Sequence, residues 1–316
     1  MVYNFLPLLF NAYFRLQFEI NRIWISLHRL IFQTSCTTST KSSSSINCNN
    51  NIVIIGDSFG YGIGDSFFTC ESAGIGYSLY YQIQIESSIR TQWTLTNYSS
   101  FKSTTNDWLP HKINKNDYNG LITTNSSLFE KNKKHIQNSS IVILFMGTQD
   151  MLQEEEEGLL LPDAALLRSM QNAIYPPEEI SSIVSNIVKI CKELQSMKKH
   201  VLVIDLPTEG LETFGRGKIR RINQQLKQAI KQENSLSTDD TNKIELISLG
   251  SNHRIMRPHQ NEDTHCPFHP LHLNRKGYEL LAYNIFQNGL KNMIVLIEWM
   301  KWKVLFEKDS KYKIKY

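Results

Sequence analysis

The sequence predicts an α/β protein, a three-layer α/β/α sandwich around a mostly parallel sheet of about five strands. Short apolar runs recur along the chain without alternation, as expected for strands that are covered on both faces. Segments with a helical period lie between these runs, which favours parallel strands joined by right-handed crossovers. The length of 316 residues suits one such domain with appendages.

The expected elements follow one another from residue 51 onward. Strands are expected over 51–55, 93–97, 141–146, 201–206 and, as the last strand, 244–249. Helices are expected over 76–88, 176–199, 218–232 and 274–290. Pro176 and Pro177 suit a first helical turn, and Ile219, Ile222 and Leu226 share one face of a helix. Residues 111–138 are polar and predict a loop or insertion.

The two ends of the chain are expected to lie outside the domain at 51–291. Residues 1–33 predict an amphipathic helix that lies on a membrane surface, packs on the domain or acts as a targeting segment. Residues 34–50 are rich in Ser, Thr and Asn and predict a linker. Residues 292–316 predict a helix and basic tail that packs on the sheet or makes a second membrane contact. Membrane-associated and organellar locations both remain open.

Composition excludes several classes of protein. The formal net charge is +4 and no basic stripe is present, so we expect no nucleic-acid partner. The five cysteines are scattered and form no CxxC pair, which argues against structural zinc. His265 and His269 stand four apart, but Pro267 argues against a metal-binding helix there. No GxGxxG segment in a dinucleotide-binding context is found, so we expect no cofactor.

The chemistry is expected to begin at Ser58. Gly56-Asp57-Ser58 follows the first apolar run, so the sequence puts a hydroxyl where a buried strand leaves the sheet. Ligands of open α/β sheets collect at the carboxyl ends of the strands, and a serine at such a place suits a nucleophile. Glycines recur from Gly56 to Gly64, which allows tight turns and close approach of backbone to a substrate.

Three later segments are expected to meet this one. The first is residues 97–109, after the second strand, and the next is Gly147-Thr148-Gln149-Asp150, after the third. The last is the His-rich stretch 266–282, at the start of the last helix of the domain. By turn chemistry alone, Asp150 is expected to cap the segment that follows its strand.

Together these blocks resemble the SGNH/GDSL hydrolase superfamily. Gly56-Asp57-Ser58 resembles its nucleophile block, and Gly147-Thr148-Gln149-Asp150 resembles its Gly-x-Asn-Asp block. His272-Leu273-Asn274-x-x-Gly277-Tyr278 resembles its histidine block. The resemblance covers roughly residues 51–290, and it implies a flavodoxin-like sheet and the chemistry of a GDSL-like lipase or esterase.

The resemblance implies ester hydrolysis through an acyl-enzyme on Ser58, with a histidine as base and a small-molecule or lipid acyl ester as substrate. It also implies an oxyanion hole made by the backbone N–H of Ser58, a backbone N–H of the second block and the amide of the third. Lys102, or a serine nearby, stands where the family has glycine, so a strained backbone is expected there. Gln149 replaces asparagine and adds one methylene, which displaces the amide. Asp57, Gly147 and Asp263 are further candidate site residues.

The catalytic histidine has three candidate registers. Spacing to Gly277-Tyr278 favours His272, and then His269 stands where the family has its aspartate. The string Phe268-His269-Pro270 favours His269, with Cys266 at the acid position. His265 is the third candidate, with Glu262 three residues before it. In the two preferred registers the orienting acid is absent or comes from elsewhere, such as Asp263 or Glu262.

The changed block residues leave a second interpretation open. The chain is either a serine-dependent esterase or a catalytically impaired protein of the same fold that binds a ligand or partner. An acyltransferase is a further alternative, because an alcohol can intercept an acyl-enzyme.

Overall fold

The computed structural model describes most of the expected domain and little outside it. The described residues are 50–62, 74–110, 126–152, 177–206, 216–237, 243–249, 265–266 and 269–313, with Leu16, Ile20, Ile23 and Leu27. At His265, His269 and His272 only the backbone is described, and Glu262 and Asp263 lie outside the described residues.

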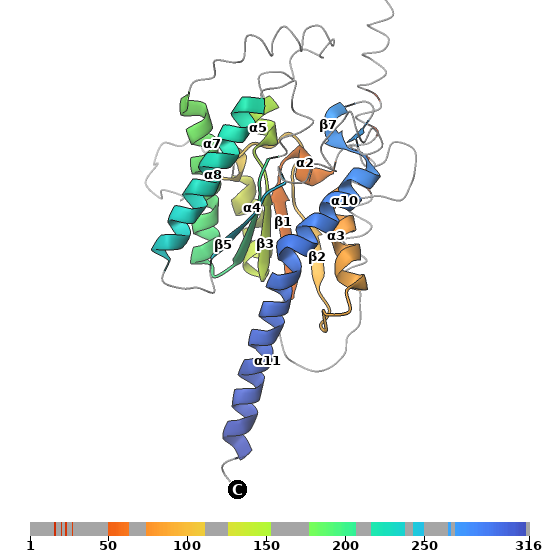
Figure 1. The fold of residues 1–316 in the computed structure, drawn as a ribbon, viewed down its shortest axis with the longest axis vertical. Coiled ribbons are helices and arrows are strands. Elements are labelled where there is room, and N and C mark those ends of the chain that lie inside the picture. Colours follow the sequence, from red (N-terminus) through yellow and green to blue (C-terminus); the bar gives the residue numbers. More distant parts are fainter. Residues whose placement is uncertain are drawn as a thin grey trace, which may run out of the picture.

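The sheet has five parallel strands in the order β2-β1-β3-β4-β5 (Figure 1). The strands are β1 (Asn51–Gly56), β2 (Thr94–Asn97), β3 (Ile141–Phe145), β4 (His200–Ile204) and β5 (Ile244–Ile247). This order is the flavodoxin-like one, and it confirms the predicted fold class. The chain order reverses between β1 and β3, so loops at their carboxyl ends diverge and leave room for a site.

Successive side chains of each strand enter two separate hydrophobic cores. In β1, Ile52 and Ile54 pack into one core, while Val53 and Ile55 pack into the other. Both sets are buried, which explains why the strands read as unbroken apolar runs.

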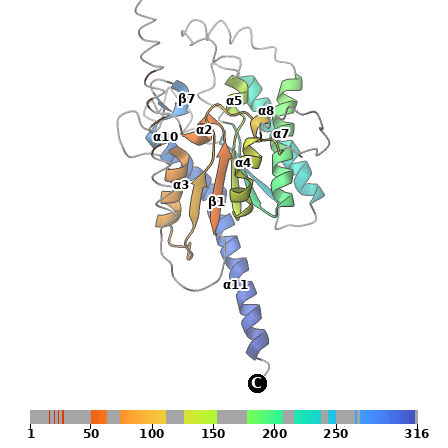
Figure 2. The same cartoon turned by 180° about the vertical axis from the view of Figure 1, so that it is seen from behind.

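Helices cover both faces, as Figures 1 and 2 show. The first core takes most of its helical residues from α3 (Gly74–Ile85), α10 (Arg275–Ile285) and the start of α11 (Lys291–Lys313). The second core takes most of its helical residues from α4 (Leu128–Gln137), α7 (Pro177–Ser196) and α8 (Arg216–Leu236). Short helices follow three strands: α2 (Ser58–Tyr61), the 3₁₀ turn η2 (Asn106–Trp108) and α5 (Thr148–Leu152).

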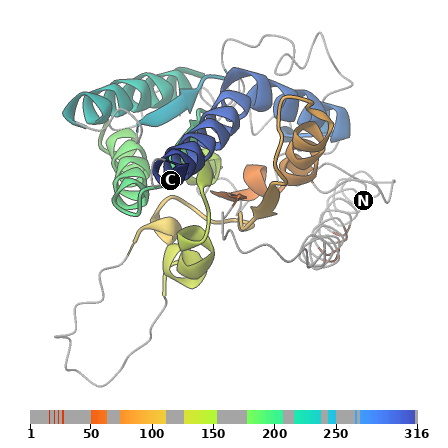
Figure 3. The same cartoon turned by 90° about the horizontal axis from the view of Figure 1, so that it is seen from below.

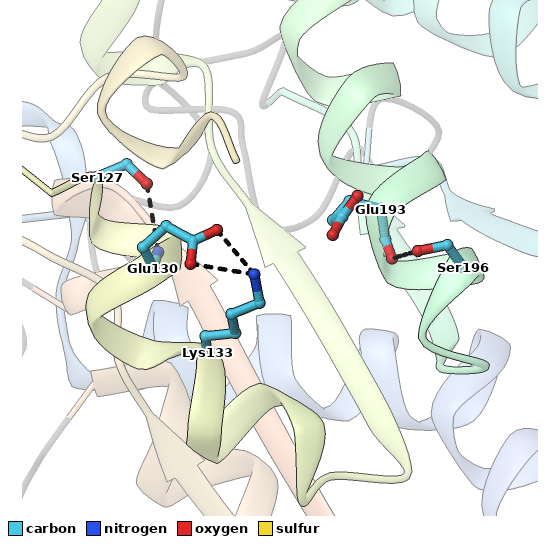
Figure 4. A network of polar contacts seen from close by, with 5 residues as sticks. All are labelled: Ser127, Glu130, Lys133, Glu193 and Ser196. Carbon is cyan, nitrogen blue, oxygen red and sulfur yellow. Dashed lines mark hydrogen bonds and ion pairs between the residues drawn. The ribbon is translucent and has the colours of Figure 1, made fainter. Parts of the chain in front are cut away.

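The expectation of a loop throughout 111–138 is wrong, because α4 occupies residues 128–137. Only Phe129 and Ile136 of this helix are buried, too few positions to produce a visible period. Local chemistry starts the helix instead: the Ser127 hydroxyl accepts from the Glu130 N–H at 3.2 Å, and Lys133 pairs with Glu130 (Figure 4). Figure 4 also shows Ser196 donating to the Glu193 carbonyl at the last turn of α7.

The expectation that the strand at 244–249 is the last one is also wrong. The histidine stretch forms a two-stranded antiparallel sheet of β6 (His265–Cys266) and β7 (His269–Leu273). Strands this short show no apolar alternation in the sequence, and Pro270 within β7 argues against a strand assignment there. The expected helix from 274 is present and continues through a π turn, Phe286–Leu290, into α11.

The two ends of the chain expose apolar side chains. Leu16, Ile20, Ile23 and Leu27 are helical and between 47% and 60% exposed. In α11 the first turns are packed on the sheet through Met293, Ile294 and Ile297, and the rest of the helix leaves the body (Figures 1 and 3). No helix among the described residues is long and apolar enough to cross a bilayer.

Glu298 fixes α11 to the edge of the sheet. Its carboxylate accepts from the backbone N–H groups of Arg90 and Thr91 at 3.1 and 3.0 Å, and from the indole of Trp93 at 3.0 Å. The Thr91 hydroxyl donates to the same group at 2.5 Å. Burial raises the pKa of the Glu298 carboxyl, but these donors outweigh burial and leave the pKa below its ordinary value.

We expect Glu298→Ala to lower the free energy of unfolding by about 2–4 kcal/mol, because the N–H groups of Arg90, Thr91 and Trp93 lose their acceptor. The measurement is urea denaturation followed by circular dichroism. The matched control is Glu279→Ala, which removes an exposed ion pair with Arg275 and should cost no more than about 0.5 kcal/mol. Equal losses in both variants would contradict this role of Glu298.

Candidate active site

Ser58 lies at the point where the chain order of the sheet reverses. It is the first residue of α2, separated from β1 by Asp57 alone, and the residue is only 3% exposed. Asp57 caps this helix, because its carboxylate accepts from the Phe59 N–H at 2.9 Å. Open α/β sheets bind their ligands beside such a reversal, at the carboxyl ends of the strands.

The Gly56 carbonyl accepts hydrogen bonds from the second block, residues 97–109. It accepts from the Ser100 N–H at 2.9 Å, the Ser103 hydroxyl at 3.0 Å and the Trp108 indole at 3.1 Å. Gly56 must be glycine, because a Cβ atom there would lie 2.0 Å from the carbonyl oxygen of Phe145. The Gly56 carbonyl therefore holds the loop after β2 at three points.

The Asp57 carboxylate accepts hydrogen bonds from the third block, residues 147–150. One oxygen accepts from the backbone N–H groups of Gly147, Thr148 and Gln149 at 3.1, 2.8 and 3.1 Å, and also from the Thr148 hydroxyl. Gly147 has a φ of 114°, so its backbone suits glycine and permits this sharp turn. Burial raises the pKa of the Asp57 carboxyl, and the hydrogen bonds from Thr148, Gln149 and Phe59 oppose that rise.

Both blocks reach the Ser58 hydroxyl. The Lys102 N–H donates to the Ser58 oxygen at 2.8 Å, and the Ser58 hydroxyl lies 3.0 Å from Oε1 of Gln149, to which it donates. Lys102 has a φ of 59°, a left-handed backbone that costs a non-glycine residue about 1 kcal/mol. The strain expected at the substituted glycine is therefore present, and the N–H still points at the serine.

Asp150 joins the second and third blocks directly. Its carboxylate accepts from the Thr105 N–H at 2.9 Å and from the Thr105 hydroxyl at 2.5 Å. Besides the local cap expected from the sequence, Asp150 therefore makes a contact across 45 residues of the chain. Burial raises the pKa of Asp150 to about 6, and the nearby charge of Asp57 adds to the rise, against the hydrogen bonds from Thr105.

The histidine block is anchored to α2, the short helix that begins at Ser58. The Tyr278 hydroxyl donates to the carbonyl of Phe59 at 3.3 Å, and the two rings lie 5.8 Å apart. Leu273, at the end of β7, is buried in the same core as Phe59. Asn274 caps α10 by accepting from the Gly277 N–H at 3.0 Å. The backbone of β7 therefore ends within the core that supports Ser58.

Five of the candidate residues form one connected network: Ser58, Asp57, Lys102, Gly147 and Gln149. The roles of His265, His269 and His272 stay predictions, as do those of Asp263 and Glu262. Sequence reasoning placed Thr105 and Trp108 in the second block but gave neither residue a role in holding the site. It also missed Asp205 after β4, which accepts from the Leu249 N–H at 2.5 Å and has its pKa raised to about 6 by burial. Among the described residues no group of His, Cys, Asp or Glu could hold a metal ion.

Comparison with known proteins gives structural matches only. No family model matches the chain, and no curated protein sequence matches it. The solved structures that it matches include the acetyl xylan esterase AlAXEase, at 13% identity and a TM-score of 0.49, over 76% of this chain and 99% of that one. Esterase EstA from a Pseudoalteromonas species matches at 13% identity and a TM-score of 0.46, over 80% of this chain and 99% of that one. A lipolytic protein of the G-D-S-L family from Veillonella parvula matches at 17% identity and a TM-score of 0.43, over 75% and 96%.

The raised pKa of Asp150 predicts a pH-dependent stability. Because this pKa is about 6 in the folded chain and ordinarily 3.8, the stability that Asp150 contributes is complete below about pH 4 and lost as the pH rises through 6. Asp150→Asn keeps an acceptor for Thr105 and removes this titration. Between about pH 4 and pH 7, the free energy of unfolding of the variant should rise by about 1–3 kcal/mol relative to that of the native chain.

The measurement is urea denaturation of both chains across this pH range. Asp205 contributes with the same sign, but it is present in both chains and cancels in the difference. A difference between the two chains that does not change with pH would contradict the assigned pKa of Asp150.

Proposed function

We propose that this chain is a serine-dependent carboxylic ester hydrolase of the SGNH/GDSL type, which acts through an acyl-enzyme on Ser58. The observation that carries the proposal is the convergence of two loops on the hydroxyl that the end of β1 carries. The Ser58 oxygen is contacted by the Lys102 N–H and by the side chain of Gln149, from two loops that the end of β1 holds in place.

Ser58 needs a base before it can attack a carbonyl, since a serine hydroxyl is a weak nucleophile. In the resting structure its hydrogen lies toward Oε1 of Gln149. Rotation of the hydroxyl would turn that hydrogen toward an imidazole, which would take it during attack and return it to the leaving group. His272 is the first candidate for this base and His269 the second, because β7 ends against the core beneath Ser58.

The oxyanion would be stabilised by donors from all three blocks. The backbone N–H groups of Ser58 and Lys102 are two, and the amide of Gln149 is the third. Since Oε1 of Gln149 faces Ser58, the amide has to turn about its last torsion to present its NH₂ group. One such donor is typically worth about 3 kcal/mol of transition-state stabilisation.

The substrate class that suits this site is a small or acyl-chain ester in a shallow crevice. Hydrolysis at Ser58 requires no cofactor, because serine, imidazole and oxyanion donors suffice for acyl transfer. The helical stripe Leu16, Ile20, Ile23 and Leu27 supports contact of the N-terminal segment with a membrane surface, as its side chains are exposed.

Ser58→Ala should abolish cleavage of p-nitrophenyl acetate, with a fall in kcat of about a thousandfold or more. The reason is that no other group replaces the attacking oxygen. Initial rates measured by absorbance test this. The matched control is Ser127→Ala, which removes a helix cap far along the chain and leaves the network of Ser58 intact.

A folded native chain with no esterase activity, or a Ser58→Ala variant as active as the native chain, would overturn the proposal. Absence of activity together with retained ligand binding would favour the impaired protein of the same fold. Product analysis with an added alcohol separates hydrolysis from acyl transfer.

Single alanine variants of the three histidines should identify the base. We expect His272→Ala to lower kcat about a thousandfold or more, and His269→Ala to lower it less. Added imidazole should restore part of the activity of the variant that lacks the base. The kcat of each variant is measured across pH, since loss of the base removes the acid limb of the profile. Full activity in all three variants would exclude a histidine base from this block.

A further inference from the structure

α11 is apolar on two opposite sides. Its inner side buries Met293, Ile294 and Ile297 against the sheet. Its outer side exposes Val295, Leu296, Trp299 and Trp302, which are called the α11 outer face below, at 38%, 44%, 58% and 55%. Positions 295, 299 and 302 form one stripe along a helix, with 296 beside it. Large apolar side chains that gather on one helix face mark a surface for contact with a partner.

The charge that the structure describes beside this face is positive: Lys303 lies over the ring of Trp299 at 5.5 Å. Lys301 is turned inward and lies over the ring of Trp93 at 5.5 Å. Glu298 is the only acidic residue within 291–304, and it is turned inward and fully occupied by Thr91, Arg90 and Trp93. Residues 301–316 contain six lysines and two acidic residues, so their net charge is +4, the same as the formal net charge of the whole chain.

We infer that the α11 outer face binds the surface of an anionic lipid bilayer. Tryptophan is enriched at the interface between membrane and water, where its ring lies among the headgroups. Lysines beside it gain from the negative potential of anionic lipid. A second copy of the chain fits the face less well, because two copies paired through it would bring their lysines together.

The position of the face supports this occupant. Glu298 and Lys301 contact residues that precede β2 and β1, so α11 leaves the body at the amino ends of the strands. Ser58 lies at the carboxyl ends, and Figure 1 shows α2 and the free end of α11 at opposite ends of the molecule. Lys301 donates to the side chain of Asn50, the residue directly before β1.

The test is co-sedimentation of the full chain with vesicles of phosphatidylcholine, with and without phosphatidylserine. The native chain should bind the anionic vesicles, and Trp299→Ser/Trp302→Ser should lower the partition constant about tenfold or more. Lys303→Glu should weaken binding to anionic vesicles only. The matched control is Tyr81→Ser/Tyr283→Ser, which removes two aromatic side chains that are about equally exposed, on α3 and α10.

Tryptophan quenching by brominated lipid assigns the contact to α11. In a Trp24→Phe background, quenching can come only from Trp299 and Trp302, because Trp93 and Trp108 are 1% and 0% exposed. Quenching that the Trp299→Ser/Trp302→Ser variant loses supports the inference. Binding without quenching, equal losses in both paired variants, or a dimer that forms through these tryptophans instead would overturn it. Thermal unfolding shows that each variant is folded, and Trp299→Phe/Trp302→Phe is a milder substitute.

Discussion

The end of β1 is the constraint on which the rest of the site depends. Two consecutive residues there accept hydrogen bonds from different loops. The Gly56 carbonyl accepts from the loop after β2, and the Asp57 carboxylate accepts from the loop after β3. The next residue is Ser58. The two loops that reach its hydroxyl are therefore held by the same short segment that carries it. Buried polar groups of this kind are costly unless each finds a partner, so a satisfied network tends to define one arrangement.

The other contacts of the site close this network. Asp150 links the two loops to each other through Thr105, and Tyr278 links the histidine block to α2 through Phe59. The left-handed backbone at Lys102 is tolerated because the loop around it is held at several points. At the far end of the strands, Glu298 does for α11 what Asp57 does for the site: one buried carboxylate satisfies several donors from a separate segment.

Much of the fold could be predicted from the sequence, because strands buried on both faces leave unbroken apolar runs such as Ile141–Phe145. α4 could not, since only two of its side chains reach the core, and β6 and β7 are too short to show a pattern. Ser58, Lys102 and Gln149 could be selected by motif and spacing. The roles of Thr105, Trp108 and Asp150 in holding the site could not, because they depend on contacts across 45 or more residues that no local pattern encodes.

The central claim is that the network around Ser58 makes this one hydroxyl reactive. The most direct test is labelling of the full chain with a fluorophosphonate, followed by peptide mass spectrometry. The structure predicts stoichiometric labelling confined to Ser58, with labelling slowed at low pH as the base becomes protonated. A folded chain that takes up no label, or that is labelled equally at other serines, would contradict the claim.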